Sequence, residues 1–162
     1  MVVVVMGVSG SGKTTIGQLL AAELGWTFVE ADDFHSPENI DKLRRGIPLD
    51  DNDRTPWLQA IRRRIDEACQ RKENLVLACS ALKHAYQNFL EQHFPSQVSY
   101  VYLQGAEKLI YDRLVTRQGH FMNPSLLHNQ FEILQPPEDS LVVQVSAAPE
   151  EIVNQIRQHL EL

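Results

Sequence analysis

The sequence predicts an α/β fold in which a five-stranded parallel sheet is covered by helices on both faces. Five short apolar runs alternate with stretches whose apolar residues recur at helical spacing. Wholly apolar runs suit parallel strands that are buried on both sides, and their alternation with helices indicates repeated strand–helix–strand crossovers. At 162 residues, the chain is long enough for a hydrophobic core of its own. We therefore expect residues 1–162 to form a single domain.

The expected strands are the apolar runs 2–6, 26–29, 75–79, 98–103 and 141–145. Helices are expected after them, beginning near Thr14, Pro37, Leu58, Leu82, Gly105, Leu126 and Pro149. Residues 49–56 are polar and end in a proline, so they are expected to form a loop before Trp57. Residues 119–124 interrupt the regular pattern, and Gly119 lies at the base of this stretch. We expect a small lid over about residues 117–124 that closes over a ligand.

Charge and composition exclude several classes of partner. The net charge of −6 argues against a nucleic-acid surface, which needs a concentrated positive face. The apolar run at residues 2–5 is too short to span a membrane and lacks a preceding basic segment, so a cytoplasmic protein with no membrane partner is expected. Cys69, Cys79 and the histidines have no zinc-site spacing, and no structural metal is expected.

The strongest motif is the stretch 7–14, Gly-Val-Ser-Gly-Ser-Gly-Lys-Thr, which fits the phosphate-loop pattern. It follows an expected strand and begins an expected helix, which is the structural context that this motif requires. Lys13 is expected to reach the β- and γ-phosphates of ATP, and the Thr14 hydroxyl to bind Mg²⁺. The candidate nucleotide-binding residues in this stretch are Gly7, Ser9, Gly10, Ser11, Gly12, Lys13, Thr14 and Thr15.

The residues outside the loop favour a small-molecule kinase over other nucleotide-binding classes. The chain contains no guanine-reading Asn-Lys-x-Asp stretch, and the third and fourth expected strands are followed by Ser80 and Gln104 rather than by acidic residues. Asp32 instead follows the second strand, where it can accept the proton of a substrate hydroxyl. The alternative is that Asp32 only caps the segment after it. Arg113 and Arg117, four residues apart, are candidates for stabilising phosphate charge, or else are solvent-facing arginines near a helix end.

Several further segments resemble one known family. They are residues 32–35 with Asn39 and Lys42, residues 46–58, residues 79–86 and residues 113–122. Together with the phosphate loop, these segments resemble the gluconokinases, in the same order along the chain, as far as about Pro137. The stretches Pro-Leu-x-Asp-x-Asp-Arg-x-Pro-Trp-Leu and Arg-x-x-x-Arg-x-Gly-His-Phe separate this family from shikimate and adenylate kinases.

The resemblance implies a P-loop kinase of nucleoside-monophosphate-kinase-like architecture that uses ATP and Mg²⁺. It implies phosphorylation of D-gluconate at its 6-hydroxyl to give 6-phospho-D-gluconate and ADP, feeding the pentose phosphate pathway, in a cytoplasmic homodimer. Lys13, Asp32 and Arg117 are then the catalytic residues. Asp32, His35, Arg54, Lys83 and His120 are implied near gluconate, and Arg113 near adenine. An acidic polyol gives Arg54 and Lys83 a carboxylate with which to pair.

Two departures and two alternatives remain. Glu30 occupies a position where the family commonly has Asp, which leaves its part in metal binding open, and Ser36 separates His35 from the next proline. One alternative is a related kinase of another polyol acid, such as shikimate. The other is a regulator that binds ATP and gluconate without turnover, although such a sensor has no need for both a base and a lid arginine.

Overall fold

The structure is a computed structural model that describes residues 1–117 and 119–162; Gln118, within the expected lid, lies outside the described residues. Its strands are β1 (Val2–Met6), β2 (Thr27–Glu30), β3 (Leu75–Ala78), β4 (Val98–Gln104) and β5 (Leu141–Gln144). All neighbouring pairs are parallel, and the strand order is β2-β3-β1-β4-β5. The predicted five-stranded parallel sheet is confirmed: β1 has the expected bounds, and the ends of the other strands differ from the expected ones by at most one residue.

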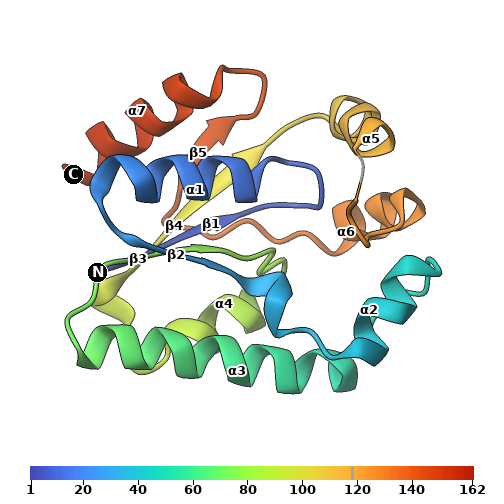
Figure 1. Cartoon of the computed structure of the whole chain (residues 1–162), viewed down its shortest axis with the longest axis horizontal. Coiled ribbons are helices and arrows are strands. Elements are labelled where there is room, and N and C mark those ends of the chain that lie inside the picture. The colour runs from blue at the N-terminus through green and yellow to red at the C-terminus, as the bar shows by residue number, and fades with distance from the viewer. Residues whose placement is uncertain (118) are drawn as a thin grey trace.

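Helices cover both faces of this sheet (Figure 1). On one face lie α1 (Lys13–Leu24), α5 (Glu107–Thr116) and α7 (Pro149–Leu160); on the other lie α3 (Asp51–Gln70) and α4 (His84–Glu91). Successive side chains of β1 point to opposite faces, and all five are completely buried. Val3 and Val5 pack in the cluster with α1 and α7, whereas Val2, Val4 and Met6 pack in the cluster with α3. This two-sided burial explains why β1 contains no polar residue.

The segment 49–56 corrects the expectation from the sequence, because most of it belongs to a helix rather than to a loop. Helix α3 begins at Asp51, and Asp50 and Asp53 form a capping box in which each side chain accepts a hydrogen bond from the other's backbone N–H. Pro56 lies inside the helix, in its second turn. A proline at this position removes one backbone hydrogen bond and crowds the carbonyl four residues earlier, so α3 continues through Pro56 in spite of that cost. The capping box stabilises a helix start at Asp51, although the polar composition of the segment is typical of a loop.

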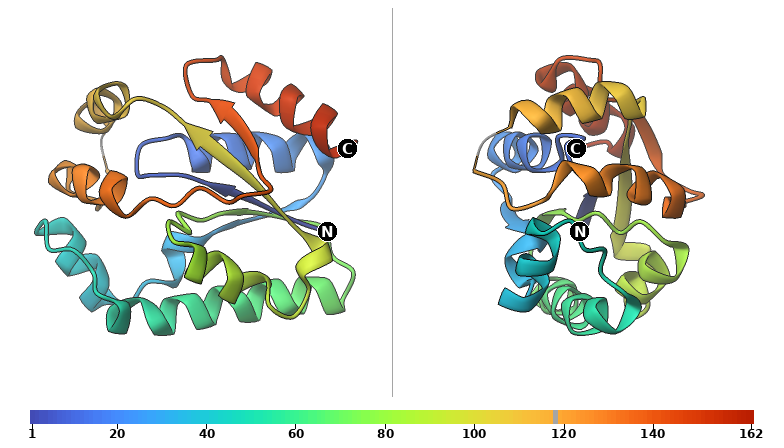
Figure 2. Two further views of the ribbon diagram at one scale, coloured as in Figure 1. Left: turned by 180° about the vertical axis from the view of Figure 1, so that it is seen from behind. Right: turned by 90° about the vertical axis from the view of Figure 1, so that its right-hand side faces the viewer.

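The remaining short helices gather at the carboxyl ends of the strands. These are α2 (Pro37–Arg44), α6 (Leu127–Ile133) and the 3₁₀ turns η1 (Ala31–Phe34) and η3 (Pro124–Leu126); a third turn, η2 (Pro95–Gln97), precedes β4. Figure 2 shows α2, α5 and α6 together at the end of the molecule away from both termini. Open parallel sheets bind their ligands at this carboxyl edge. No helix among the described residues is long and apolar enough to cross a membrane.

Candidate active site

The phosphate loop connects β1 to α1 with the tight backbone that the motif predicts. Gly10 has φ +80°, and a Cβ atom there would lie 2.6 Å from Cγ of Leu114, so only glycine fits. Lys13 begins α1, and its ammonium group donates a hydrogen bond to the Val8 carbonyl at 3.0 Å. Burial lowers the pKa of Lys13, although Asp32 and Glu30 oppose this effect. The lysine therefore lies folded over its own loop.

A cavity of about 300 Å³ lies beside this loop, on the α5 and α7 side of the sheet. Arg113 and Arg117, predicted to act together, both line it; the predicted loop residues that line it are Gly10, Ser11, Gly12 and Thr15. The start of α7 and the segment before it also line the cavity, through Val145, Ala147 and Pro149. None of these three residues was predicted to belong to a binding site. Its volume is at the lower end of those of ligand pockets.

Glu30, whose part the sequence left open, lies directly against the phosphate loop. One of its carboxylate oxygens accepts a hydrogen bond from the Thr14 hydroxyl at 2.5 Å, and the other accepts from the Asp32 backbone N–H at 3.3 Å. Glu30 is the N-cap of the turn η1 that carries Asp32. Burial raises the pKa of the Glu30 carboxyl. One side chain thus links the Mg²⁺-binding candidate Thr14 to the candidate base.

Asp32 lies at the carboxyl end of β2, in η1, where it faces several cationic or ionisable groups. Burial raises the pKa of its carboxyl, but His120, Lys13 and His35 lower it more strongly, so that the net pKa lies below its ordinary value. The carboxyl is therefore ionised at neutral pH. An ionised carboxylate is the form that accepts a proton.

Two residues of the expected lid, Arg117 and His120, reach the loop and Asp32. Helix α5 ends at Thr116 and Arg117 is its C-cap, so Arg117 leaves the helix and donates to the Ser9 hydroxyl at 3.3 Å. The His120 Nδ1 atom lies 2.9 Å from the Arg117 guanidinium and accepts from the Met122 backbone N–H at 3.1 Å. Both neighbours are donors, so the proton of a neutral His120 is on Nε2, which lies 3.6 Å from an Asp32 carboxylate oxygen.

A second, smaller cavity of about 70 Å³ lies between the phosphate loop and helices α2 and α3. Its lining includes the predicted residues Ser9, Lys13, Asp32, His35 and Arg54, together with Leu43, Leu49, Trp57, Ser80, Leu82, Met122 and Gln130. The His35 ring stacks on the Trp57 indole at 4.6 Å between centroids, and Trp57 Nε1 donates to the Ala31 carbonyl at 2.8 Å. Burial and the charge of Arg54 lower the pKa of His35, and Asp32 opposes them.

Lys83 is the one predicted acceptor-side residue that lies apart from this cavity and from Asp32. Its ammonium group is 3.6 Å from Asp51, at the start of α3. The Asp51 carboxylate also accepts from the Tyr86 hydroxyl at 2.6 Å and lies 3.7 Å from the Arg54 guanidinium. Arg54 in turn donates to the Tyr86 oxygen at 3.1 Å. Asp51 thus acts as a common counter-ion for the two cations, and Tyr86 orders the group.

Sequence reasoning missed Trp57, Tyr86 and Gln130 as members of the site. Trp57 and Tyr86 lie inside the segments 46–58 and 79–86 that resemble the gluconokinases, but neither was given a role in the site; both are buried in the structure. Gln130 accepts a hydrogen bond from the Ser9 backbone N–H at 2.7 Å although 121 residues separate the two. No local sequence pattern predicts a hydrogen bond between residues so far apart in the chain.

Several known proteins are similar to this chain over most of its length. A family model described as "AAA domain" matches residues 2–131. A mouse protein named "Probable gluconokinase" is 42% identical, with 99% of this chain and 97% of the mouse protein aligned. A crystal structure of a gluconokinase from Sinorhizobium meliloti superposes with a TM-score of 0.84 at 40% identity, covering 98% of this chain and 94% of that one. A sugar kinase from Janibacter gives a TM-score of 0.91 at 43% identity, covering 99% and 94%. The chain belongs to the gluconokinase family of P-loop kinases.

Proposed function

We propose that this protein transfers the γ-phosphoryl group of ATP to the 6-hydroxyl of D-gluconate, giving 6-phospho-D-gluconate and ADP. The observation that carries the proposal is the cavity of about 70 Å³, because phosphate-loop residues and acceptor-side residues line the same space. Lys13 and Ser9 line it together with Asp32 and Arg54. A hydroxyl bound there would lie between the base and the end of the triphosphate.

In the proposed reaction, Asp32 accepts the proton of the 6-hydroxyl, and the oxygen of that hydroxyl forms a bond to the γ-phosphorus of ATP. The bond from that phosphorus to the β–γ bridging oxygen breaks, and ADP leaves with the electron pair. Lys13 and Arg117 place positive charge around the transferred group, which is how proteins stabilise this transition state. The lowered pKa of Asp32 supports its part as the base.

Recognition of the acid is assigned to Arg54, in the first turns of α3, and to Lys83, the N-cap of α4. Arg54 has a side chain that is only 16% exposed and lines the cavity, so its pairing with a carboxylate takes place largely out of water. Lys83 does not line this cavity, but it shares the counter-ion Asp51 with Arg54 and so adds positive charge beside it. His35, held flat against Trp57, is assigned to the hydroxyls of the polyol.

Magnesium belongs to the same proposal. The hydroxyl of Thr14 and the carboxylate of Glu30 form a pair of oxygen donors, which suits a hard cation that takes its other ligands from phosphates and water. When bound, Mg²⁺ would neutralise charge on the β- and γ-phosphates. Thr14 would hold the ion, and Glu30 would orient the Thr14 hydroxyl.

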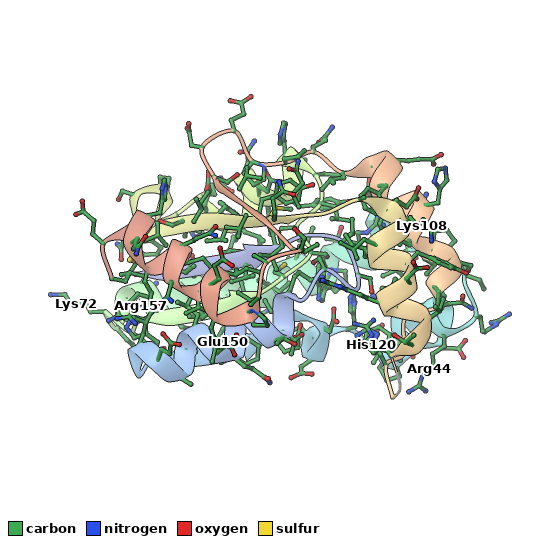
Figure 3. The ribbon with its side chains drawn as sticks, turned by 90° about the horizontal axis from the view of Figure 1, so that it is seen from above. Arg44, Lys72, Lys108, His120, Glu150 and Arg157 are labelled. Atoms are coloured by element: carbon green, nitrogen blue, oxygen red, sulfur yellow. The ribbon has the colours of Figure 1, made fainter. Side chains whose placement is uncertain are left out.

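The lid, residues 117–124 in this proposal, opens to admit gluconate and closes before transfer. The cavity of about 70 Å³ is much smaller than the roughly 300 Å³ at which ligand pockets usually begin. The segment around Met122 is held to α2 by the Asn123 backbone, which donates to the Leu43 carbonyl at 3.1 Å. Figure 3 shows His120 and Arg44 at the same end of the molecule, and the Asn123 amide also donates to the Arg44 carbonyl. Parting of these contacts would enlarge the cavity.

The proposal is tested by ADP release from Mg²⁺ and ATP with D-gluconate, shikimate, AMP or other aldonates as acceptor. We expect turnover with gluconate, much weaker turnover with the other acceptors, and loss of turnover in Asp32→Asn. Turnover with shikimate alone would favour a kinase of another polyol acid. Binding of ATP and gluconate with no ADP release would favour a regulator. A cytoplasmic homodimer, which the family resemblance implies, is part of the proposal and is tested by light scattering and cell fractionation.

A further inference from the structure

Gln130 joins the helix after the lid to the phosphate loop. Its side-chain oxygen accepts the Ser9 backbone N–H at 2.7 Å. Ser9 is 7% exposed, and a buried backbone N–H needs a partner. The partner of this loop N–H is therefore a side chain from α6, more than a hundred residues away in the chain. Gln130 fixes the position of the loop at this point.

Ser9 also receives a contact from the other end of the lid. The Arg117 guanidinium donates to the Ser9 hydroxyl at 3.3 Å, so the place of Arg117 depends on where Ser9 lies. Arg117 is the first residue of the proposed lid, Gln130 lies in the helix that follows the lid, and both contact Ser9. Ser9 and Gln130 line the small cavity together with Lys13 and Asp32. A displacement of Ser9 would therefore change the shape of the cavity in which Lys13 and Asp32 lie.

We propose that Gln130 is a positioning residue that, by holding Ser9, sets the guanidinium of Arg117 over the phosphate loop. This inference rests on the proposed function, since it concerns the phosphoryl-transfer step of that reaction. Gln130 donates no proton and makes no bond to the transferred group. It makes fast transfer depend on the correct docking of α6 and the lid against the loop.

Gln130→Met tests this inference, because methionine is similar in length and apolar but cannot accept the Ser9 N–H. A misplacement of catalytic groups by about 1 Å costs on the order of 100-fold in rate. We expect kcat with ATP and gluconate to fall by about 10- to 100-fold, while KM for gluconate changes much less. Asn129→Met, the same kind of change one position earlier in α6, is the matched control and should leave kcat near wild type.

A double-mutant cycle with Ser9→Ala separates positioning from a general structural effect. Ser9→Ala removes the hydroxyl that Arg117 contacts, so Gln130 can no longer act on Arg117 through it. We expect Gln130→Met to cost much less kcat in the Ser9→Ala background than in the wild type. Additive losses would overturn the inference, as would a Gln130→Met enzyme with wild-type kcat.

A measurement on the free protein needs no acceptor. Because the Gln130 oxygen holds the Ser9 N–H, amide hydrogen exchange across residues 7–12 should speed up in Gln130→Met and remain unchanged in Asn129→Met. Unchanged exchange in Gln130→Met would overturn the inference, whatever the acceptor panel shows for wild type. That panel decides the proposed function separately. If Gln130→Met does not fold, Gln130→Asn, which keeps the amide but is one methylene shorter, replaces it in both experiments.

Discussion

The Nε2 atom of His120 lies 3.6 Å from the carboxylate of Asp32, so a lid residue faces the candidate base directly. Asp32 lies in the turn after β2, whereas His120 belongs to the proposed lid. If that lid opens as proposed, His120 would leave the charge environment of the base. This coupling has a measurable consequence for the pH dependence of turnover.

His120→Ala should move the acid limb of the pH profile of kcat/KM to higher pH. His120 is one of the groups that lower the pKa of Asp32, whereas burial raises it. The base is active when ionised, so activity is lost as pH falls through the Asp32 pKa, and removing His120 raises that pKa. His93→Ala, which breaks a histidine–aspartate pair with Asp66 away from the site, should leave the limb in place. An unmoved acid limb in His120→Ala would show that this contact does not tune the base.

Arg117 and Arg113 line one cavity but should give different kinetic effects. Arg117→Met should lower kcat by about 100- to 1,000-fold, because it removes a preorganised donor from the developing charge. Arg113→Met should mainly raise KM for ATP, since among the described residues Arg113 lines the cavity of about 300 Å³ beside the phosphate loop without a hydrogen bond to Ser9 or His120. Initial-rate kinetics on both variants measure kcat and KM for ATP and so test whether the two arginines have separate roles. Equal losses of kcat in the two would contradict separate roles.

Glu30→Gln should raise the Mg²⁺ concentration needed for half-maximal turnover by severalfold. Glutamine keeps the length of the side chain but removes the negative charge beside the Thr14 hydroxyl. KM for gluconate should change little, because Glu30 does not line the cavity of about 70 Å³ in which gluconate is proposed to bind. A Mg²⁺ titration at fixed ATP and gluconate measures both quantities. A shift in the gluconate KM alone would assign Glu30 to the acceptor instead.

Trp57→Phe should lower the free energy of unfolding by about 1–3 kcal/mol, because it leaves the buried Ala31 carbonyl without its indole donor. Urea denaturation measures this loss. Trp26→Phe, at a half-buried position just before β2, is the control and should cost less. Comparable losses in the two variants would assign the cost to reduced packing rather than to the hydrogen bond.

The parts of this site that the sequence revealed are those carried by local patterns. The strand 2–6 could be predicted because burial on both faces leaves no room for polar residues, and the phosphate loop because its glycines are required by local backbone geometry. Asp32 was found from its place after a strand. The start of α3 was mispredicted because the capping pair Asp50 and Asp53 makes a helix start look like a polar loop.

The contacts that the sequence did not reveal are those between distant segments. The Gln130–Ser9 hydrogen bond spans 121 residues, and the Arg54–Tyr86 hydrogen bond spans 32. Each depends on how α6 or α4 packs against the loop and α3, which no periodicity encodes. Such contacts follow from tertiary packing alone, so only the structure identifies Gln130 and Tyr86 as members of the site.

The most direct test of the account is to identify the phosphorylated product by phosphorus NMR after incubation with Mg²⁺, ATP and D-gluconate. The account predicts one phosphate monoester, coupled to the protons on carbon 6 of gluconate and formed in step with ADP, and almost none with Asp32→Asn. Free inorganic phosphate as the only new phosphorus species besides ADP, or a monoester at another carbon, would contradict it. An Asp32→Asn enzyme that forms the ester at the wild-type rate would contradict the assignment of the base.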